Sequence, residues 1–258
     1  MGRNIPVRKR AAAITAVLLL GSISVATSAA LAANAAGREP VRIATRTDEA
    51  HDIGMVIPRM TIARLHYEGG GDWYANPSSL PNLLDALRER TTLPVERDPA
   101  EVRLTDDQLW DYPILHATGH GEMRLDDAEV ERLREYLNRG GFLHVDDNYG
   151  LDASFRREIA RVFPDRPLVD VPLSHPVYHL VYDLPRGIPK IHEHDGKAPR
   201  GMGIFIGDRL AVFYSYESDL GNGWEDVGTY EDPPALHEAA LQMGVNLFVY
   251  AVTSRPVS

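Results

Sequence analysis

Aspartate side chains stand at a position of this sequence where acid–base chemistry is plausible on physical grounds. The segment Asp146-Asp147-Asn148-Tyr149-Gly150 directly follows the apolar run 142–145, which is typical of a buried strand. Neighbouring side chains on an extended backbone face opposite ways, so one carboxyl group can enter a site while the other caps the next helix. Two capping or solvated aspartates are an equally good interpretation.

Histidines form a second cluster with a different chemistry. Four of them fall within 20 residues, in the segments HPVYH and HEHD: His175, His179, His192 and His194. Together with Glu193 and Asp195 they offer the nitrogen and oxygen ligands that Zn, Mn or Fe accepts. We therefore predict these four histidines as ligands of a divalent metal. The alternative is structural, because a His-Pro pair also forms turns and a buried histidine can be a hydrogen-bonded core residue.

Three further segments combine glycine with polar or aromatic residues. Gly119-His120-Gly121 is either a tight turn or a place for a proton-shuttling histidine. The loop 217–226, ESDLGNGWED, is expected to be a solvated acidic loop anchored by Trp224, with carbohydrate stacking as the alternative. GGGDWY at 69–74 matches neither a Walker loop nor a G-x-G-x-x-G fingerprint, so nucleotide binding is not expected.

Composition restricts the function further. The chain has 258 residues, with 27 Lys and Arg against 37 Asp and Glu, and a formal net charge of -10. This charge argues against a protein that binds nucleic acid through phosphates or docks electrostatically on anionic lipid. The sequence has no cysteine, which excludes disulfides, a thiolate nucleophile and cysteine-ligated metals.

The first 35 residues are predicted to be a signal peptide. A basic start, MGRNIPVRKR, precedes an uncharged run, and small residues allow cleavage at Ala32 or Ala35. An uncleaved membrane anchor is the alternative, since the uncharged run is long enough to span. Cleavage predicts a periplasmic or secreted protein without a stable membrane span, and residues 36–58 form an irregular lead-in to the domain.

Strand-like and helix-like segments alternate through residues 59–254. Strands are predicted at 61–67, 112–117, 142–145 and 168–171, a hairpin at 202–206 and 210–216, and helices beginning near Ser78, at 126–139, 154–163 and 234–253. This alternation predicts an α/β domain of three layers around a mostly parallel sheet, amidotransferase-like or flavodoxin-like, with an added β-hairpin. Ligands of such sheets lie at the carboxyl ends of the strands, so we expect Asp146–Gly150 and the histidine segment to share one cleft.

Two resemblances follow from these motifs. The segments GGGDWY, GHG, GGFLHVDDNYG, HPVYH, KIHEHDG and FYSYESDLGNGWED together resemble the bacterial DUF4159 family over nearly all of 60–253. The run 110–150 is similar, in architecture, to the class I glutamine-amidotransferase-like superfamily that includes the ThuA-like proteins. In true amidotransferases the turn after the Gly-Gly strand carries the cysteine nucleophile. Here that turn is Asp146–Gly150 and no cysteine exists, so glutaminase chemistry by that route is excluded.

The superfamily resemblance selects Asp147, since it lies nearer the nucleophile-positioning turn. One hypothesis is an exported, hydrolase-like enzyme in which Asp147 is the general base or a ligand, and His120 and His175 assist with or without a divalent metal. The other is a non-catalytic envelope domain that binds a partner protein or carbohydrate. Family members resemble parts of larger envelope proteins associated with MoxR-type ATPase and von Willebrand-type systems, which implies such partners.

Overall fold

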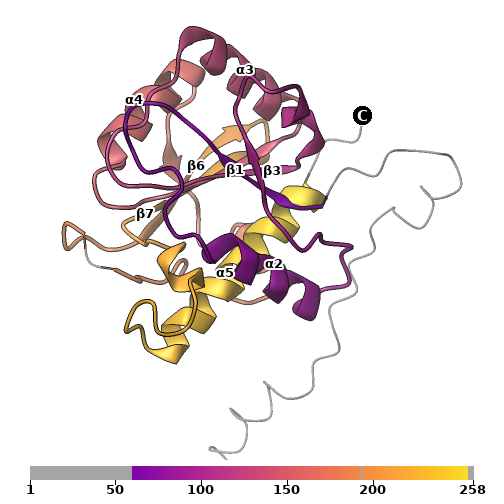
Figure 1. The fold of residues 1–258 in the computed structure, drawn as a ribbon, viewed down its shortest axis with the longest axis vertical. Helices are drawn as coiled ribbons and strands as arrows, with labels where there is room; N and C mark the ends of the chain where they lie inside the picture. The colour runs from indigo at the N-terminus through magenta and orange to yellow at the C-terminus, as the bar shows by residue number, and fades with distance from the viewer. Residues whose placement is uncertain (1–59, 193, 255–258) are drawn as a thin grey trace, which may run out of the picture. The chain divides into compact units, whose positions relative to one another are not determined.

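A seven-stranded sheet forms the middle layer of the domain (Figure 1). The computed structural model describes residues 60–192 and 194–254, so the predicted signal peptide at 1–35 and the lead-in at 36–58 lie outside the described residues. The strands are β1 Ile62–Leu65, β2 Ala100–Val102, β3 Ile114–Ala117, β4 Phe142–Asp146, β5 Val169–Asp170, β6 Arg200–Ile206 and β7 Arg209–Tyr216. Their order across the sheet is β2-β1-β3-β4-β7-β6-β5.

Five neighbouring strands of this sheet are parallel. β2, β1, β3, β4 and β7 run the same way, whereas β6 pairs antiparallel with β7 and β5 antiparallel with β6. The predicted mostly parallel sheet and its added hairpin are therefore confirmed. Because β4 and β7 are adjacent, the segments that follow Asp146 and Tyr216 emerge side by side at one edge of the sheet.

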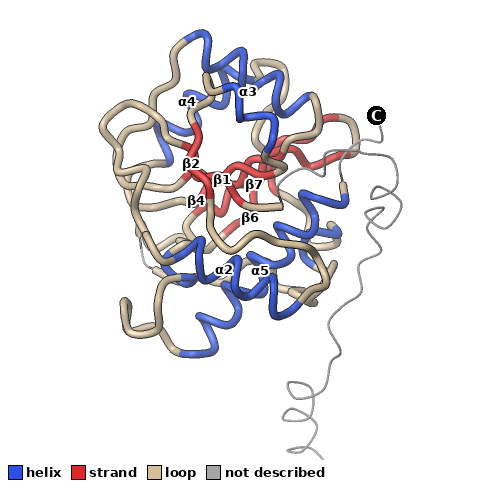
Figure 2. Tube along the Cα trace, turned by 45° about the vertical axis from the view of Figure 1, so that its right-hand side comes forward, coloured by secondary structure: helices blue, strands red, loops and turns tan. Residues whose placement is uncertain are grey.

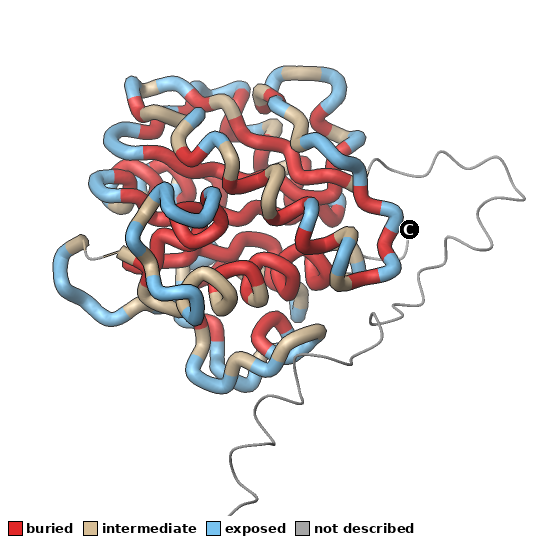
Figure 3. Tube along the Cα trace, turned by 60° about the horizontal axis from the view of Figure 1, so that its bottom comes forward, coloured by how far each residue is buried: buried red, intermediate tan, exposed pale blue. Residues whose placement is uncertain are grey.

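Four helices cover the two faces of the sheet: α2 Ser79–Arg90, α3 Asp127–Asn138, α4 Asp152–Val162 and α5 Pro234–Thr253. The pair α2 and α5 lies on one face, and the pair α3 and α4 on the other (Figures 1 and 2). Each face has its own apolar core, one around Leu84, Phe213 and Phe248 and the other around Leu137 and Phe155. Every residue of the central strands β3 and β4 is buried, which explains their mostly apolar sequence. Figure 3 shows buried residues running through the middle of the molecule, with the exposed ones at its outer loops.

Local sequence signals account for helix α3. Asp126 accepts a hydrogen bond from the backbone N–H of Glu129, whose side chain in turn accepts from the N–H of Asp126, which forms a capping box. At the other end Gly140 adopts a φ of 101°, a conformation that other residues rarely tolerate, and the N–H of Gly141 donates to the carbonyl of Tyr136. The helix thus begins and ends where its sequence predicts.

Short and edge elements differ from the prediction. The strand expected at 168–171 is only the two-residue edge strand β5, and the three-residue edge strand β2 was not expected at all. Helix α2 lacks the predicted serine side-chain cap. The carboxylate of Glu225, distant in sequence, accepts hydrogen bonds from the backbone N–H groups of Ser78 and Ser79 instead. Among the described residues, no helix combines the length and apolar character needed to cross a bilayer.

Candidate functional site

Asp146 ends strand β4 and is completely buried. Its Oδ1 accepts hydrogen bonds from Oγ of Ser215 at 2.7 Å and the N–H of Leu220 at 2.8 Å, and its Oδ2 accepts from the N–H of Gly221 at 2.6 Å. Burial and the negative charge of Asp219 raise its pKa to about 7, and the three donors oppose this shift. Asp146 therefore anchors the loop after β7 from inside the protein.

Asp147 faces a different environment. Its Oδ2 accepts a hydrogen bond from the N–H of Glu217 at 2.7 Å, and burial raises its pKa to about 6. The expectation that one of the two aspartates caps the next helix is wrong, because α4 begins after Leu151 without any side-chain cap. Both aspartates instead hold the segment that follows β7.

His194 lies between two carboxylates. Its Nε2 is 3.3 Å from Oδ2 of Asp219, and its Nδ1 is 4.0 Å from Oδ2 of Asp147. The hydrogen bond to Asp219 is the main reason why the pKa of His194 is raised, and the side chain is only 7% exposed. The expected proximity of the aspartate turn and the histidine segment is therefore present at His194.

Asp219 contacts both histidines of this segment and two asparagine side chains. Its Oδ1 accepts from Nδ2 of Asn148, and its Oδ2 accepts from Nδ2 of Asn222, both at 2.7 Å, while Nδ1 of His192 lies 3.5 Å from Oδ2. Burial alone would raise the pKa of Asp219, but the hydrogen bonds from His192 and His194 outweigh it and lower the pKa. We call Asp147, His192, His194 and Asp219 the His–Asp centre.

Unusual backbone conformations surround the His–Asp centre. The non-glycine residues with positive φ in the described part of the chain are Asn76 at 56°, Glu217 at 56° and Asp219 at 62°. Glu217 is buried and paired with Nζ of Lys190 at 2.7 Å, which lowers its pKa against the effect of burial. Strained conformations of this kind persist where the surrounding contacts hold them, and they concentrate at functional sites.

Asn148 joins three loops at the carboxyl edge. Its Oδ1 accepts hydrogen bonds from the hydroxyl of Thr118 and, at 2.9 Å, from the N–H of Gly119, both in the loop after β3. Its Nδ2 reaches Asp219 in the loop after β7. Sequence reasoning missed both Asn148 and Asp219 as site residues. The available signal was their position directly after strands, which becomes informative only once β4 and β7 are known to be neighbours.

The side chains of His120 and Tyr149 are exposed at the carboxyl edge of the sheet and are not buried in the His–Asp centre. Nδ1 of His120 lies 3.1 Å from Oδ2 of Asp72, and about half of the His120 side chain is exposed. Tyr149 is 63% exposed, with its ring centroid 6.2 Å from that of His194. The predicted catalytic residue His120 therefore belongs to the same sheet edge, but it pairs with Asp72 and not with Asp147.

The predicted four-histidine cluster does not assemble. His175 packs on the rings of Phe205 and Tyr250, and the Tyr250 hydroxyl accepts from the N–H of Leu210 at the amino end of β7, opposite the His–Asp centre. His179 contacts Asp183 and the carbonyl of residue 173 instead. The separation of His175 and His179 from His192 and His194 could not be predicted, because residues in irregular loops follow no regular spacing. Within residues 60–192 and 194–254, no three His, Asp or Glu side chains are arranged to hold a metal ion.

The segment 217–226 is not the solvated acidic loop that was expected. Glu217, Asp219 and Glu225 are each at most 5% exposed, because the loop packs between β4 and helices α2 and α5. Trp224 does anchor the loop, as predicted, and its Nε1 donates to the carbonyl of Ala240 at 2.7 Å. A buried tryptophan cannot stack on a carbohydrate, so that alternative for Trp224 is wrong.

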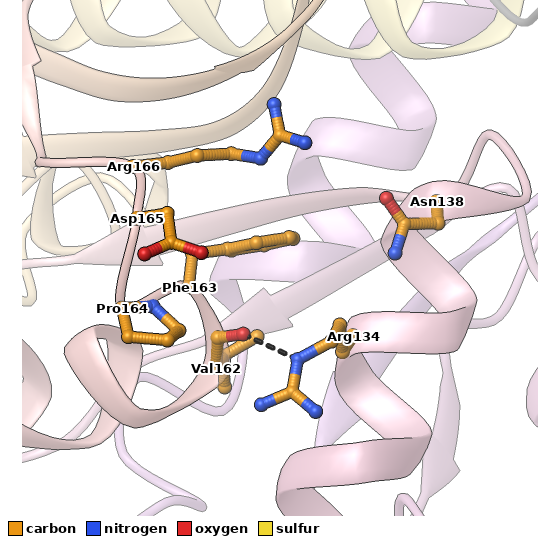
Figure 4. Close-up of a pocket in the computed structure, with 7 residues that line it drawn as sticks. All are labelled: Arg134, Asn138, Val162, Phe163, Pro164, Asp165 and Arg166. Carbon is orange, nitrogen blue, oxygen red and sulfur yellow. Dashed lines mark hydrogen bonds between the residues drawn. The ribbon is translucent and has the colours of Figure 1, made fainter.

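A hollow of about 390 Å³ lies away from the His–Asp centre. Arg134 and Asn138 of helix α3 form one wall, and the end of α4 with the residues that follow it, 162–166, forms the other (Figure 4). Nε of Arg134 donates to the carbonyl of Val162, which ties the two walls together. None of the predicted site residues lines this hollow, so its size alone does not make it the functional site.

Comparison with known proteins gives a family and no activity. The family described as "Domain of unknown function (DUF4159)" matches residues 61–252, which include every residue of the His–Asp centre. No curated protein matches the chain.

Proposed function

This chain belongs to the DUF4159 family, and we propose that it is an exported, hydrolase-like enzyme whose acid–base residues are those of the His–Asp centre. Export is proposed from the signal peptide at 1–35, and a periplasmic or secreted location follows from it. An origin within the class I glutamine-amidotransferase-like superfamily, with Asp147 near the position of the lost cysteine, is part of the same proposal.

The position of His194 between Asp219 and Asp147 is the observation that supports this function most. Ionised Asp219 accepts a hydrogen bond from Nε2–H of His194, which orients the ring and makes Nδ1 more basic. Nδ1 then faces Asp147 across 4.0 Å, too long for a direct hydrogen bond but short enough for a water or a substrate hydroxyl to bridge.

Asp147 and His194 have complementary proton affinities. Burial raises the pKa of Asp147 to about 6, so this carboxyl group exchanges its proton near neutral pH, and the hydrogen bond to Asp219 raises the pKa of His194, so the imidazole holds its proton more tightly than a free histidine does. A pair of this kind suits general base and general acid steps of hydrolysis. The pair accepts a proton from the attacking water and returns it to the leaving group. His120, exposed at the rim and paired with Asp72, contacts the substrate in this proposal.

A test needs no knowledge of the natural substrate. Untagged protein would be assayed on chromogenic esters, phosphoesters, glycosides and amides, with His194→Gln and Asp147→Asn as site variants. We expect at least about a 100-fold fall in kcat for His194→Gln on any substrate that wild type turns over. His179→Gln is the matched control, because His179 is likewise paired with an aspartate but lies elsewhere.

Two outcomes would contradict the proposal. One is equal activity of His194→Gln and His179→Gln; the other is the absence of turnover on every substrate class. Elemental analysis of the same samples for Zn, Mn and Fe tests the metal-dependent version. Stoichiometric metal in wild type that is lost in His194→Ala would support it.

Carbohydrate binding without catalysis is the second candidate. Tyr74 and Tyr149 are 64% and 63% exposed, and they follow β1 and β4 at the carboxyl edge. Exposed aromatic rings beside carboxylates suit stacking on sugar rings. Retention on insoluble polysaccharide that falls in Tyr149→Ala but persists in His194→Gln would favour this function over hydrolysis.

A further inference from the structure

Two histidines lie in the core beneath the His–Asp centre, and neither takes part in the proposed chemistry. His116 of β3 and His144 of β4 are directly opposite in the parallel register, and they are 1% and 2% exposed. Both side chains face the α2–α5 layer, where their rings lie 5.6 Å from that of Trp224. Their Nδ1 atoms are 3.0 Å apart, which is a hydrogen-bond distance.

A continuous line of polar atoms connects this pair to Asp146. Nε2 of His144 lies 3.1 Å from Oγ of Ser215, and the same Oγ lies 2.7 Å from Oδ1 of Asp146. Ser215 and Asp146 are both completely buried, so water does not compete for these contacts. Asp146 in turn accepts from the backbone N–H groups of Leu220 and Gly221, next to Asp219.

The chemistry of each group sets the direction of the hydrogen bonds. Oγ of Ser215 lies 2.7 Å from Oδ1 of Asp146 and 3.1 Å from the carbonyl oxygen of Val145. Above the Asp146 pKa of about 7 both groups only accept, so the single hydroxyl proton of Ser215 goes to one of them, and the carboxylate is the nearer and the charged acceptor. Ser215 must then accept from Nε2–H of His144. Because burial lowers the pKa of both histidines and keeps them neutral, His144 has no second proton, and its Nδ1 accepts from Nδ1–H of His116.

We propose that His116, His144 and Ser215 form a one-way chain of hydrogen bonds that ends on Asp146 and positions the loop 217–221. Every donor in this chain points toward the carboxylate, and bonds aligned in this way polarise one another. Nε2 of His116 is left as an acceptor at the far end. It has no partner among the described protein atoms, and His116 lines an otherwise mostly apolar cavity of about 10 Å³. A protonated Nε2 there would be a buried, unpaired donor, so this end of the chain agrees with the same direction.

This chain of hydrogen bonds adds residues that touch no substrate to the proposed function. Asp219, which orients His194, has a φ of 62° and directly precedes the two N–H groups that Asp146 holds. His116, His144 and Ser215 are therefore positioning residues for the His–Asp centre. The inference rests on the proposed function only where it says that the loop 217–221 serves the His–Asp centre. The direction of the hydrogen bonds does not depend on any activity.

Ring nitrogen chemical shifts of the full-length, ¹⁵N-histidine-labelled protein give the decisive measurement. We expect the Nδ1–H tautomer for His116 and the Nε2–H tautomer for His144, because the two tautomers have distinct ¹⁵N shifts. An Nδ1–H tautomer for His144, or an imidazolium form of either ring at neutral pH, would overturn the proposal. This measurement stays informative if no enzymatic activity is ever found.

Substitutions at Ser215 test the positioning role. Ser215→Ala should change the ring ¹⁵N shifts of His144 and speed amide exchange at Leu220 and Gly221 by at least about 10-fold, since Asp146 loses a donor. Ser215→Thr keeps the hydroxyl and should restore both. Ser154→Ala is the control, because Ser154 is also a buried serine and its hydroxyl donates to the carbonyl of Leu151 at the start of α4, away from this loop. Equal exchange rates at Leu220 and Gly221 in Ser215→Ala and Ser154→Ala would refute the role; if Ser215→Ala fails to fold, the wild-type tautomers decide.

Discussion

Nε2 of His194 lies 3.3 Å from Oδ2 of Asp219, and neither side chain is more than 7% exposed. The pair raises the pKa of His194 and lowers that of Asp219, so each group favours the charged form of the other. Replacing Asp219 by Asn removes the main cause of the His194 shift. We therefore expect the pKa of His194 to fall in Asp219→Asn, measured by NMR titration of the imidazole. An unchanged pKa would show that the pair is not formed in solution.

The same pair predicts how stability depends on pH. A histidine with a raised folded-state pKa adds stability that is complete below its unfolded pKa of about 6.5 and is lost as the pH rises through the folded value. His194→Gln should therefore cost about 1 kcal/mol more at pH 5.5 than at pH 9, measured by guanidinium unfolding. Comparing variant with wild type at each pH cancels the titration of the other groups. A cost that does not decrease with pH would contradict the prediction.

Asp147 should destabilise the fold when it is ionised. Its pKa is raised to about 6 by burial, so the folded state holds a proton more tightly than the unfolded state, and stability falls as the pH rises from about 4 to 6. Asp147→Asn removes this cost, and its Oδ1 still accepts from the N–H of Glu217. We expect this variant to be more stable than wild type at pH 8 by about 1–3 kcal/mol.

Asp146→Asn is the contrasting variant at the adjacent position. Both oxygens of Asp146 accept hydrogen bonds, so an amide NH₂ would face a buried donor whichever way it turned. A loss of about 2–4 kcal/mol is expected, measured by urea unfolding. Equal effects of the two substitutions would mean that the aspartates do not have the separate environments described above.

Long, periodic elements were predictable from the sequence, and short ones were not. Apolar residues at helical spacing identify α2, α3 and α4, and a run of mostly apolar residues identifies β4. Strand β2, with Glu101 exposed at the sheet edge, has too few residues for any period to show. The hairpin β6–β7 was visible in sequence, but the pairing of β7 with β4 is a long-range contact that no local pattern encodes.

Part of the candidate site was likewise predictable from the sequence, and part depended on long-range contacts. Asp147 and His194 were expected near one another because the first follows a buried strand and the second lies in a proline-rich loop over the sheet edge. Asp219 was interpreted as a solvated acid, since its burial depends on the β4–β7 neighbourhood. His175 was assigned to the same cleft by proximity in sequence, yet the loop carries it to the opposite edge.

Asn148 should couple the stability of three loops. Its side-chain oxygen accepts hydrogen bonds from Thr118 and Gly119, and its side-chain nitrogen donates to Asp219. The Asn148 side chain is fully buried. Asn148→Ala leaves these partners unpaired, with an expected loss of about 2–3 kcal/mol in urea unfolding. Asn148→Asp keeps the shape but places a second carboxylate against Asp219, so it should also raise the pKa of His194 further. A neutral effect of both substitutions would exclude Asn148 as the link.

Glu225 should act as a cap for helix α2 from 147 residues away in sequence. Its Oε1 accepts from the N–H groups of Ser78 and Ser79 at 3.0 Å each, and its Oε2 accepts from the Ser78 hydroxyl at 2.9 Å. A carboxylate at this end also interacts favourably with the helix dipole, and the site is buried, which reduces screening by salt.

Removing the carboxylate of Glu225 should loosen both helix α2 and the loop 217–226. We expect Glu225→Ala to cost about 2 kcal/mol and Glu225→Gln less, because the amide oxygen still accepts but carries no charge. Asp226→Ala is the matched control, since Asp226 is adjacent and exposed, and its carboxylate accepts from the side-chain amide of Asn82 rather than from a backbone N–H at the start of α2. Thermal unfolding monitored by circular dichroism ranks the three variants. If Asp226→Ala lowers Tm as much as Glu225→Ala does, helix capping by Glu225 is not what holds the loop to α2.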